Sequence, residues 1–149
     1  MKNVRDVLKD KTKEVWSILP YASVYDALKL MGEKQIGALM VIDDHGKVVG
    51  IISERDYARK VILKGKTSKE TKVEEIMTPA SEMYGVKPDN SVEDCMVLMT
   101  GKHVRHLPVF ENNQFTGVVS IGDVVKSIIW EQGALIEQLS NYIAGKYPS

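Results

Sequence analysis

The chain contains an internal repeat, and this repeat restricts its fold more than any other feature. Residues 20–62 align with residues 88–129, with one gap in a loop where "DDHGK" is a residue longer than "ENNQ". Identical pairs include Pro20 and Pro88, Ser23 and Ser91, Asp26 and Asp94, Met31 and Met99, Gly50 and Gly117, Ser53 and Ser120, and Asp56 and Asp123. A duplication of this length indicates one supersecondary unit that occurs twice.

Each copy carries the signals of two helices and two strands. Ser23 and Ser91 can each cap a helix, and apolar residues follow with the spacing of one buried helical face, at 24, 27, 28 and 31 and at 92, 95, 96 and 99. Two short apolar strands joined by a turn come next, and Asp56 and Asp123 then stand at the start of a second helix. With a short leading strand, each copy predicts the order β-α-β-β-α.

This order predicts an α/β (α+β) fold built from tandem repeats. Sheets of this size cannot bury both faces alone, so we expect the two copies to form a pseudo-twofold pair with their sheets packed against each other. The expected segments are a first repeat with its leader at residues 1–66, a second repeat at 67–130 and a C-terminal helical extension at 131–149.

Composition narrows the class of protein. The 20 basic residues balance the 20 acidic ones, which argues against nucleic acid as a partner. The amino terminus is charged from its second residue, and no apolar run approaches the roughly 20 residues that span a bilayer. The only cysteine, Cys95, cannot form an internal disulfide or a Cys-only zinc site. We therefore expect a cytoplasmic protein without a membrane span.

The repeated unit resembles a known family. The β-α-β-β-α order occurring twice, with "LPV" at 107–109 followed by Gly117, Ser120 and Asp123, resembles the CBS domain pair, also called the Bateman module. The resemblance covers nearly the whole chain, from Val4 to Ile129. It implies two clefts that bind adenosine-containing ligands such as AMP, ADP, ATP, NADH or S-adenosylmethionine. It also implies a homodimer that regulates another protein in trans and requires no cofactor.

The resemblance assigns a main cleft to the second repeat. A carboxylate fixed at a helix start can accept hydrogen bonds from both ribose hydroxyls, and this is the role implied for Asp123. Ser120 would bond a phosphate or sugar oxygen, and the pair Arg105 and His106 would neutralise phosphates. The full set expected at the main cleft is Arg105, His106, Ser120, Asp123, Gly37 and Ala38 beside the adenine, and Thr12 from the leader.

A second cleft would be formed by the corresponding residues of the first repeat. These are Ser53, Arg55, Asp56 and the leader residue Thr78. Gly37 and Ala38 stand where the second repeat has Arg105 and His106, so this cleft lacks the basic pair. Arg55 could partly replace it, because the second repeat has Gly122 there. We therefore expect the cleft of Asp123 to be the main one.

Three alternatives stand beside this interpretation. Asp56 and Asp123 could only cap helices, which would leave a structural interaction module with empty clefts. A small redox or nucleotide-hydrolysing enzyme could use Cys95, yet Cys95 falls in an apolar stripe and no nucleophile, base and orienting group occur together. His103 and His106 lack enough further ligands for a metal site. We expect no catalytic residue and no metal.

Overall fold

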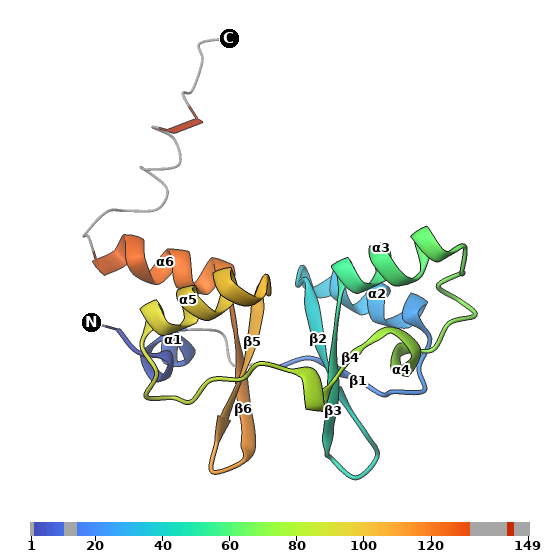
Figure 1. Ribbon diagram of the computed structural model, residues 1–149, viewed down its shortest axis with the longest axis horizontal. Coiled ribbons are helices and arrows are strands. Elements are labelled where there is room, and N and C mark those ends of the chain that lie inside the picture. Colours follow the sequence, from blue (N-terminus) through green and yellow to red (C-terminus); the bar gives the residue numbers. More distant parts are fainter. Residues whose placement is uncertain (1, 11–14, 132–142, 145–149) are drawn as a thin grey trace. The chain divides into compact units, whose positions relative to one another are not determined.

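The computed structural model describes residues 2–10, 15–131 and 143–144 (Figure 1). The chain divides into two compact units, which we name by the repeat that each contains. The first-repeat unit is Glu14–Met83, and the second-repeat unit combines Met1–Lys13 with Tyr84–Ser149. In the part of the chain that the structure describes, no helix is long and apolar enough to cross a membrane.

The first-repeat unit is built on a four-stranded sheet in the order β1-β2-β3-β4. Strand β1 is parallel to β2, whereas β2 with β3 and β3 with β4 are antiparallel. Its elements are β1 (Ser17–Ile18), α2 (Val24–Lys34), β2 (Ala38–Ile42), β3 (Val48–Ser53), α3 (Glu54–Lys60), η1 (Ile62–Lys64), α4 (Val73–Ile76), β4 (Thr78–Pro79) and η2 (Ala80–Glu82).

The core of this unit follows the predicted helical spacing. Helix α2 buries Val24, Ala27 and Met31, which pack with apolar residues of β2 and β3. Its first turn is capped by Ser23, whose Oγ accepts a hydrogen bond from the N–H of Asp26 at 3.0 Å. A capped helix with one apolar face therefore covers the sheet, as the sequence predicts.

The second-repeat unit has the same plan around a two-stranded antiparallel sheet. Its elements are α1 (Val4–Asp10), α5 (Val92–Lys102), β5 (His106–Glu111), β6 (Gln114–Ser120) and α6 (Ile121–Glu131). The leading strand is reduced to one residue, because Val86 forms an isolated parallel bridge with Val109. Apart from this reduction, the structure confirms the predicted β-α-β-β-α order in both repeats and the mixed α/β class.

The short leader helices are exchanged between the sequence repeats. Helix α1 precedes the first repeat, yet its Val4 and Val7 are buried in the core of the second-repeat unit. The N–H of Val4 donates to the carbonyl oxygen of Asn90 at 2.9 Å. Helix α4 precedes the second repeat, yet the N–H of Val73 donates to the carbonyl oxygen of Ala22 in the first-repeat unit at 2.8 Å.

The packing units therefore differ from the expected segments 1–66 and 67–130, which describe the repeats of the sequence. Each leader helix is too short to be stable by itself, so it buries its apolar residues in a larger core. Helix α1 does so in the second-repeat unit and α4 in the first-repeat unit. The predicted C-terminal extension, 131–149, lies almost wholly outside the described residues.

Candidate functional site

The repeated Ser-x-x-Asp motif lies where a strand runs directly into a helix. Strand β6 ends at Ser120, and its N–H donates to Oδ2 of Asp123 at 2.8 Å, while the N–H of Asp123 donates to Oγ of Ser120 at 3.2 Å. Ser53 and Asp56 make the same pair of contacts at 2.9 and 3.3 Å. Both Asp side chains thus cap their helices, and the contacts fix each carboxylate in place.

The preceding strand brings the predicted basic pair to this junction. His106 of β5 pairs with Ser120 of β6, and the carbonyl oxygen of Arg105 accepts a hydrogen bond from the N–H of Ile121 at 2.8 Å. The structure therefore gathers Arg105, His106, Ser120 and Asp123 at one end of the second-repeat sheet.

Gly37 and Ala38 occupy the equivalent place in the first-repeat unit. Ala38 pairs with Ser53, and the carbonyl oxygen of Gly37 accepts a hydrogen bond from the N–H of Glu54 at 3.1 Å. Both residues are expected beside the adenine of the main cleft, and within the first-repeat unit they lie beside Ser53. Their position follows from the strand register, which repeats in both copies.

The remaining predicted residues belong to the first-repeat unit or lie outside the described chain. Thr78 of β4 pairs with Ile51 of β3, so the leader residue runs beside the strand that ends at Ser53. Arg55 is half-buried in the first turn of α3, next to Asp56. Thr12 lies outside the described residues.

The glycine of each repeated motif makes room for a leader segment. A Cβ atom on Gly50 would lie 2.6 Å from the carbonyl oxygen of Thr78 and 2.7 Å from Sδ of Met77. A Cβ atom on Gly117 would lie 3.0 Å from Cδ2 of Leu8. The glycine is therefore part of the packing of the exchanged leaders, and the serine and aspartate form the helix cap.

Lys60 is a further residue of the first motif that the sequence interpretation missed. Its Nζ lies 3.2 Å from Oδ1 of Asp56 and donates a hydrogen bond to the carbonyl oxygen of Ile76 at 2.9 Å. The signal was present, because a lysine four residues after an aspartate on a helix is placed to form an ion pair. The second repeat has Ser127 at this position, whose side chain carries no charge.

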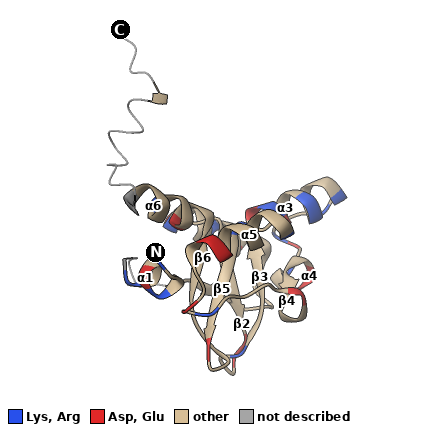
Figure 2. Ribbon diagram, turned by 60° about the vertical axis from the view of Figure 1, so that its left-hand side comes forward, with Lys and Arg blue, Asp and Glu red and all other residues tan. Residues whose placement is uncertain are grey.

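The two motifs also differ in the positions of the basic residues near them. In Figure 2 the ribbon of α3 is coloured blue at its Lys and Arg residues, which include Arg55, Arg59 and Lys60. In α6 the equivalent positions are Gly122, Lys126 and Ser127. The basic residues of the first motif therefore lie on the helix that carries the aspartate, whereas Arg105 and His106 of the second motif lie at the start of β5.

Cys95 is a core residue. Its side chain is 1% exposed among Val92, Met99 and other apolar residues. Burial, with smaller effects of Asp94 and Glu93, raises the pKa of its thiol to about 11. The thiol is therefore protonated at neutral pH, and no group of three or more His, Cys, Asp or Glu suited to a metal ion occurs among the described residues.

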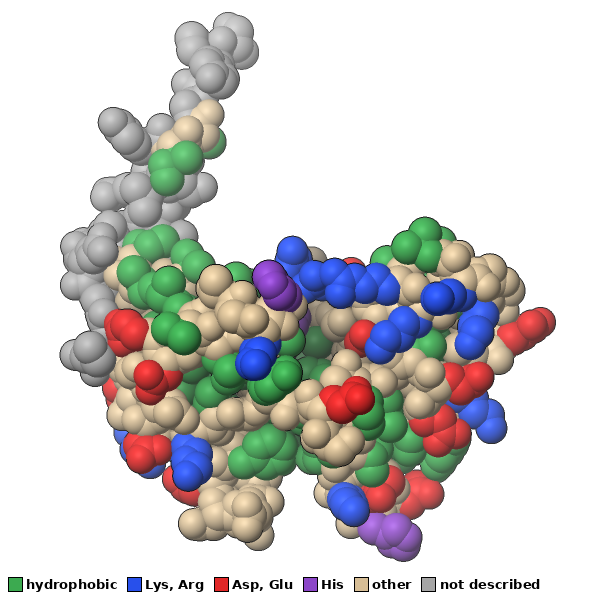
Figure 3. Space-filling view, viewed as in Figure 1, with side chains coloured by type: hydrophobic (Ala, Val, Ile, Leu, Met, Phe, Trp, Pro, Cys, Tyr) green, Lys and Arg blue, Asp and Glu red, His purple; other side chains and the backbone are tan. Residues whose placement is uncertain are grey.

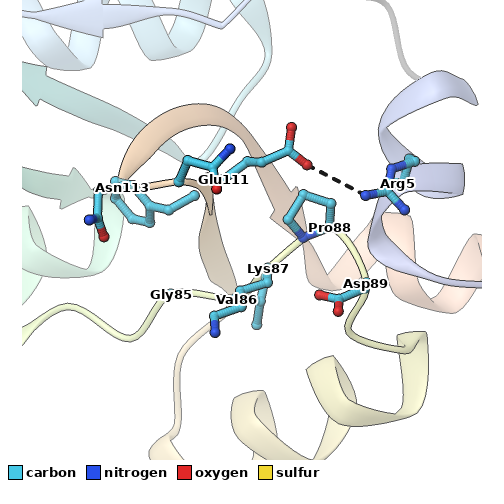
Figure 4. Close-up of a pocket in the computed structure, with 10 residues that line it drawn as sticks. Arg5, Gly85, Val86, Lys87, Pro88, Asp89, Glu111 and Asn113 are labelled. Atoms are coloured by element: carbon cyan, nitrogen blue, oxygen red, sulfur yellow. Dashed lines mark hydrogen bonds and ion pairs between the residues drawn. The ribbon is translucent and has the colours of Figure 1, made fainter.

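Each unit has a hollow on its described surface. One of about 610 Å³ in the second-repeat unit is bordered by the β5–β6 turn, the segment 85–89 and Arg5, which pairs with Glu111 at 3.4 Å (Figure 4). It contains none of the predicted site residues. The other, of about 430 Å³, is lined by Gly37 and Glu54 together with residues at the end of α2, and it adjoins the first motif.

Comparison with known proteins agrees with this architecture. The CBS domain family matches residues 4–63 and 73–129. The chain is 40% identical over 151 residues to the CBS domain-containing protein CBSX3, mitochondrial, of Arabidopsis thaliana, which covers 97% of this chain and 73% of that protein.

Solved structures show the same likeness. A protein with CBS domains from Burkholderia ambifaria is 46% identical, with a TM-score of 0.84 over 91% of this chain and 99% of the other. A CBS-domain-containing protein from Agrobacterium tumefaciens is 35% identical, with a TM-score of 0.81 over 86% of this chain and 100% of the other. With two matches to the family and its fold in both units, the chain belongs to the CBS domain family and contains a pair of CBS repeats.

Proposed function

We propose that this chain is a regulatory module that binds an adenosine-containing ligand through its Ser-x-x-Asp motifs. The observation that carries the proposal is the fixed carboxylate of Asp123, held by Ser120 beside Arg105 and His106. Asp123 is half-buried, so its carboxylate combines a fixed direction with access to solvent. Such a carboxylate suits the two adjacent hydroxyls of a ribose.

The basic pair favours a ligand that carries phosphate. Arg105 is exposed and always charged, and His106 next to it can add a second donor. AMP, ADP, ATP and NADH combine ribose and phosphate, and S-adenosylmethionine shares the ribose alone. The CBS domain pair of the protein MJ0100 was solved in complex with 5′-methylthioadenosine and S-adenosyl-L-methionine. That protein is 24% identical to this chain and supports the fold, so the ligand class rests on the motif residues.

The proposal assigns no catalytic residue to the chain. The protonated, buried thiol of Cys95 opposes the redox alternative. Instead, a protein bound in trans would respond to the presence of ligand in the site. A cytoplasmic location is part of the same proposal and is supported by the single, unpaired cysteine.

The proposal includes self-association. Apolar side chains lie over α5 and α6 (Figure 3), where Val97 is 74% exposed and Val125 is 50% exposed. A patch of this kind is typical of an interface, and we propose a homodimer. One related structure, a CBS-CP12 protein from cyanobacteria at 29% identity, is hexameric. Sedimentation velocity over a range of protein concentrations distinguishes monomer, dimer and hexamer.

The test is ligand binding by the purified chain. AMP, ADP, ATP, NADH and S-adenosylmethionine are added to the wild type, to Asp123→Ala and to Asp56→Ala, and the midpoint of thermal unfolding is measured. A ligand at a hundredfold excess over its Kd stabilises by about 2.7 kcal/mol, a rise on the order of 5 to 10 °C for a chain of this size. The rise should be much smaller in Asp123→Ala, where only the weaker first motif is left to bind. No rise with any ligand would leave the structural interaction module as the better interpretation.

A further inference from the structure

The two Ser-x-x-Asp motifs share their backbone geometry, but only the first has a lysine four residues after its aspartate, where the second has Ser127. Oδ2 of Asp56 accepts hydrogen bonds from the N–H of Ser53 at 2.9 Å and from its hydroxyl at 3.1 Å. Oδ1 of Asp56 forms the ion pair with Nζ of Lys60 at 3.2 Å. Both carboxylate oxygens are therefore already engaged inside the first-repeat unit.

Lys60 also connects this carboxylate to the leader. Its Nζ donates to the carbonyl oxygen of Ile76, the last residue of α4, at 2.9 Å. Two residues later, Thr78 pairs with Ile51 on the strand that leads into Ser53. One ammonium group thus joins the Asp of the motif to the segment 73–79.

We infer that Lys60 is an internal competitor for Asp56 that weakens nucleoside binding at the first motif and couples its occupancy to the leader α4–β4. This inference rests on the proposed function, since it concerns the same ribose-binding role. A ribose that bonds to Asp56 must share or displace the ammonium group of Lys60. When it does so, Lys60 keeps only its bond to the leader, and the anchoring of α4–β4 changes.

The exposure of the pair sets the expected size of the effect. The side chain of Lys60 is 43% exposed and that of Asp56 is 15% exposed, so solvent screens the attraction in part. Competition from such a pair should change the affinity by about two- to fivefold. Adenosine is the suitable probe, because a phosphate would add its own attraction to Lys60 and hide the competition.

The experiment isolates the first motif on an Asp123→Ala background. Adenosine binding is measured by calorimetry with Lys60 present, with Lys60→Ser, which introduces the residue of the second repeat, and with Lys60→Met, which keeps the length of the side chain. Lys64→Ser is the control, because it removes the same charge from η1, at an exposed residue outside the motif. Both Lys60 variants should bind adenosine about two- to fivefold more tightly, and the control should not.

Hydrogen exchange measures the coupling between ligand binding at Asp56 and the leader α4–β4. Without ligand, the amides of residues 73–79 should exchange faster in Lys60→Met, because the bond to Ile76 is lost. With Lys60 present, adenosine should change the exchange of residues 73–79, and in Lys60→Met it should not. Binding with the same affinity and the same exchange response in both chains would overturn the inference alone. Failure of the wild type to bind any adenosine ligand would remove the proposed function and this inference with it.

Discussion

Ser120 and Asp123 exchange two hydrogen bonds across the junction of β6 and α6, one from Ser120 N–H to Oδ2 of Asp123 at 2.8 Å and one from Asp123 N–H to Oγ of Ser120 at 3.2 Å. The pair caps the helix and fixes the direction of the carboxylate at once. In the proposed function a helix cap and a ligand-binding group therefore coincide in Asp123, and only a variant that separates the two roles can test them.

Asp123→Asn separates these roles. The amide oxygen can still accept the N–H of Ser120, so α6 keeps its cap, but the amide nitrogen is a donor and cannot accept a second ribose hydroxyl. We expect a midpoint of thermal unfolding close to that of the wild type and a ligand-induced rise that is largely lost. Asp123→Ala should lose most of the rise and also about 1 to 2 kcal/mol of stability. A full ligand-induced rise in Asp123→Asn would show that the carboxylate serves only as a cap.

The two motif glycines should differ in their tolerance of alanine. In Gly50→Ala the new Cβ would lie 2.6 Å from a backbone oxygen of β4, so the leader strand must move, at a cost of about 1 to 3 kcal/mol. In Gly117→Ala the nearest atom is the end of the Leu8 side chain at 3.0 Å, which can rotate away. Urea unfolding of both variants measures the difference. Equal losses would contradict the leader contact as the reason for the glycine.

Local signals explain what the sequence predicts correctly. Ser23 and Ser91 cap the helices that they were expected to cap. The predicted apolar stripes are buried at 24, 27 and 31 and at 92, 95 and 99, whereas Leu28 is half-buried and Met96 is 42% exposed, so the stripe is wrong at Met96. Caps and helical faces depend on residues three or four positions apart, so they can be read from one stretch of chain. The pairing of β2 with β3 and of β5 with β6 can also be predicted locally, because a short turn joins the two strands of each pair.

Long-range contacts explain what the sequence does not predict. Val4 and Val73 stand at equivalent places in the leaders, but nothing near them indicates which core each will join. Lys60 stands four residues after Asp56, which suggests an ion pair, yet its second bond to Ile76 joins residues 16 positions apart. The binding role proposed for Asp123 comes from the family resemblance, since a cap and a ribose-binding carboxylate have the same sequence pattern.

The leader exchange predicts where a core substitution will act. Val7 and Ile76 are equivalent residues of α1 and α4, and each is buried in the unit that does not contain its own sequence repeat. Ile76→Ala should cost about 2 to 5 kcal/mol and should speed amide exchange in Glu14–Met83. Val7→Ala should cost less, because a smaller side chain is lost, and should act on residues 84–129. Loss of protection in the opposite units would contradict the exchange.

The cap of α5 gives a dependence on pH. Hydrogen bonds from the Ser91 backbone and from Asn90 lower the pKa of Asp94 below its ordinary value of 3.8. Because the folded-state pKa is the lower one, the stabilisation is present above pH 3.8 and is lost as the pH falls through the folded value. Asp94→Ala should therefore unfold at a lower temperature than the wild type at pH 6, and the two midpoints should converge below pH 4. A difference that persists unchanged in acid would contradict the charged cap.

Cys95 should be unreactive while the chain is folded. Its pKa of about 11 lies two units above the ordinary 9.0, so at pH 8 the folded protein holds about a hundredfold less thiolate than the unfolded chain. Burial of the sulfur slows the attack further, because the reagent must reach a side chain that is 1% exposed. Iodoacetamide should therefore modify the native protein at least a hundred times more slowly than the protein in urea.

Mass spectrometry of the intact chain follows this reaction with time, and the urea sample is the internal control for reagent and pH. The rate of modification of the native chain should rise with pH up to about pH 11. For an exposed thiol of ordinary pKa, the rate would instead level off near pH 9. The raised pKa also makes folding less favourable at high pH, since the unfolded thiol ionises first. Native and unfolded rates of similar size would place Cys95 at the surface and would restore the redox enzyme as a candidate function.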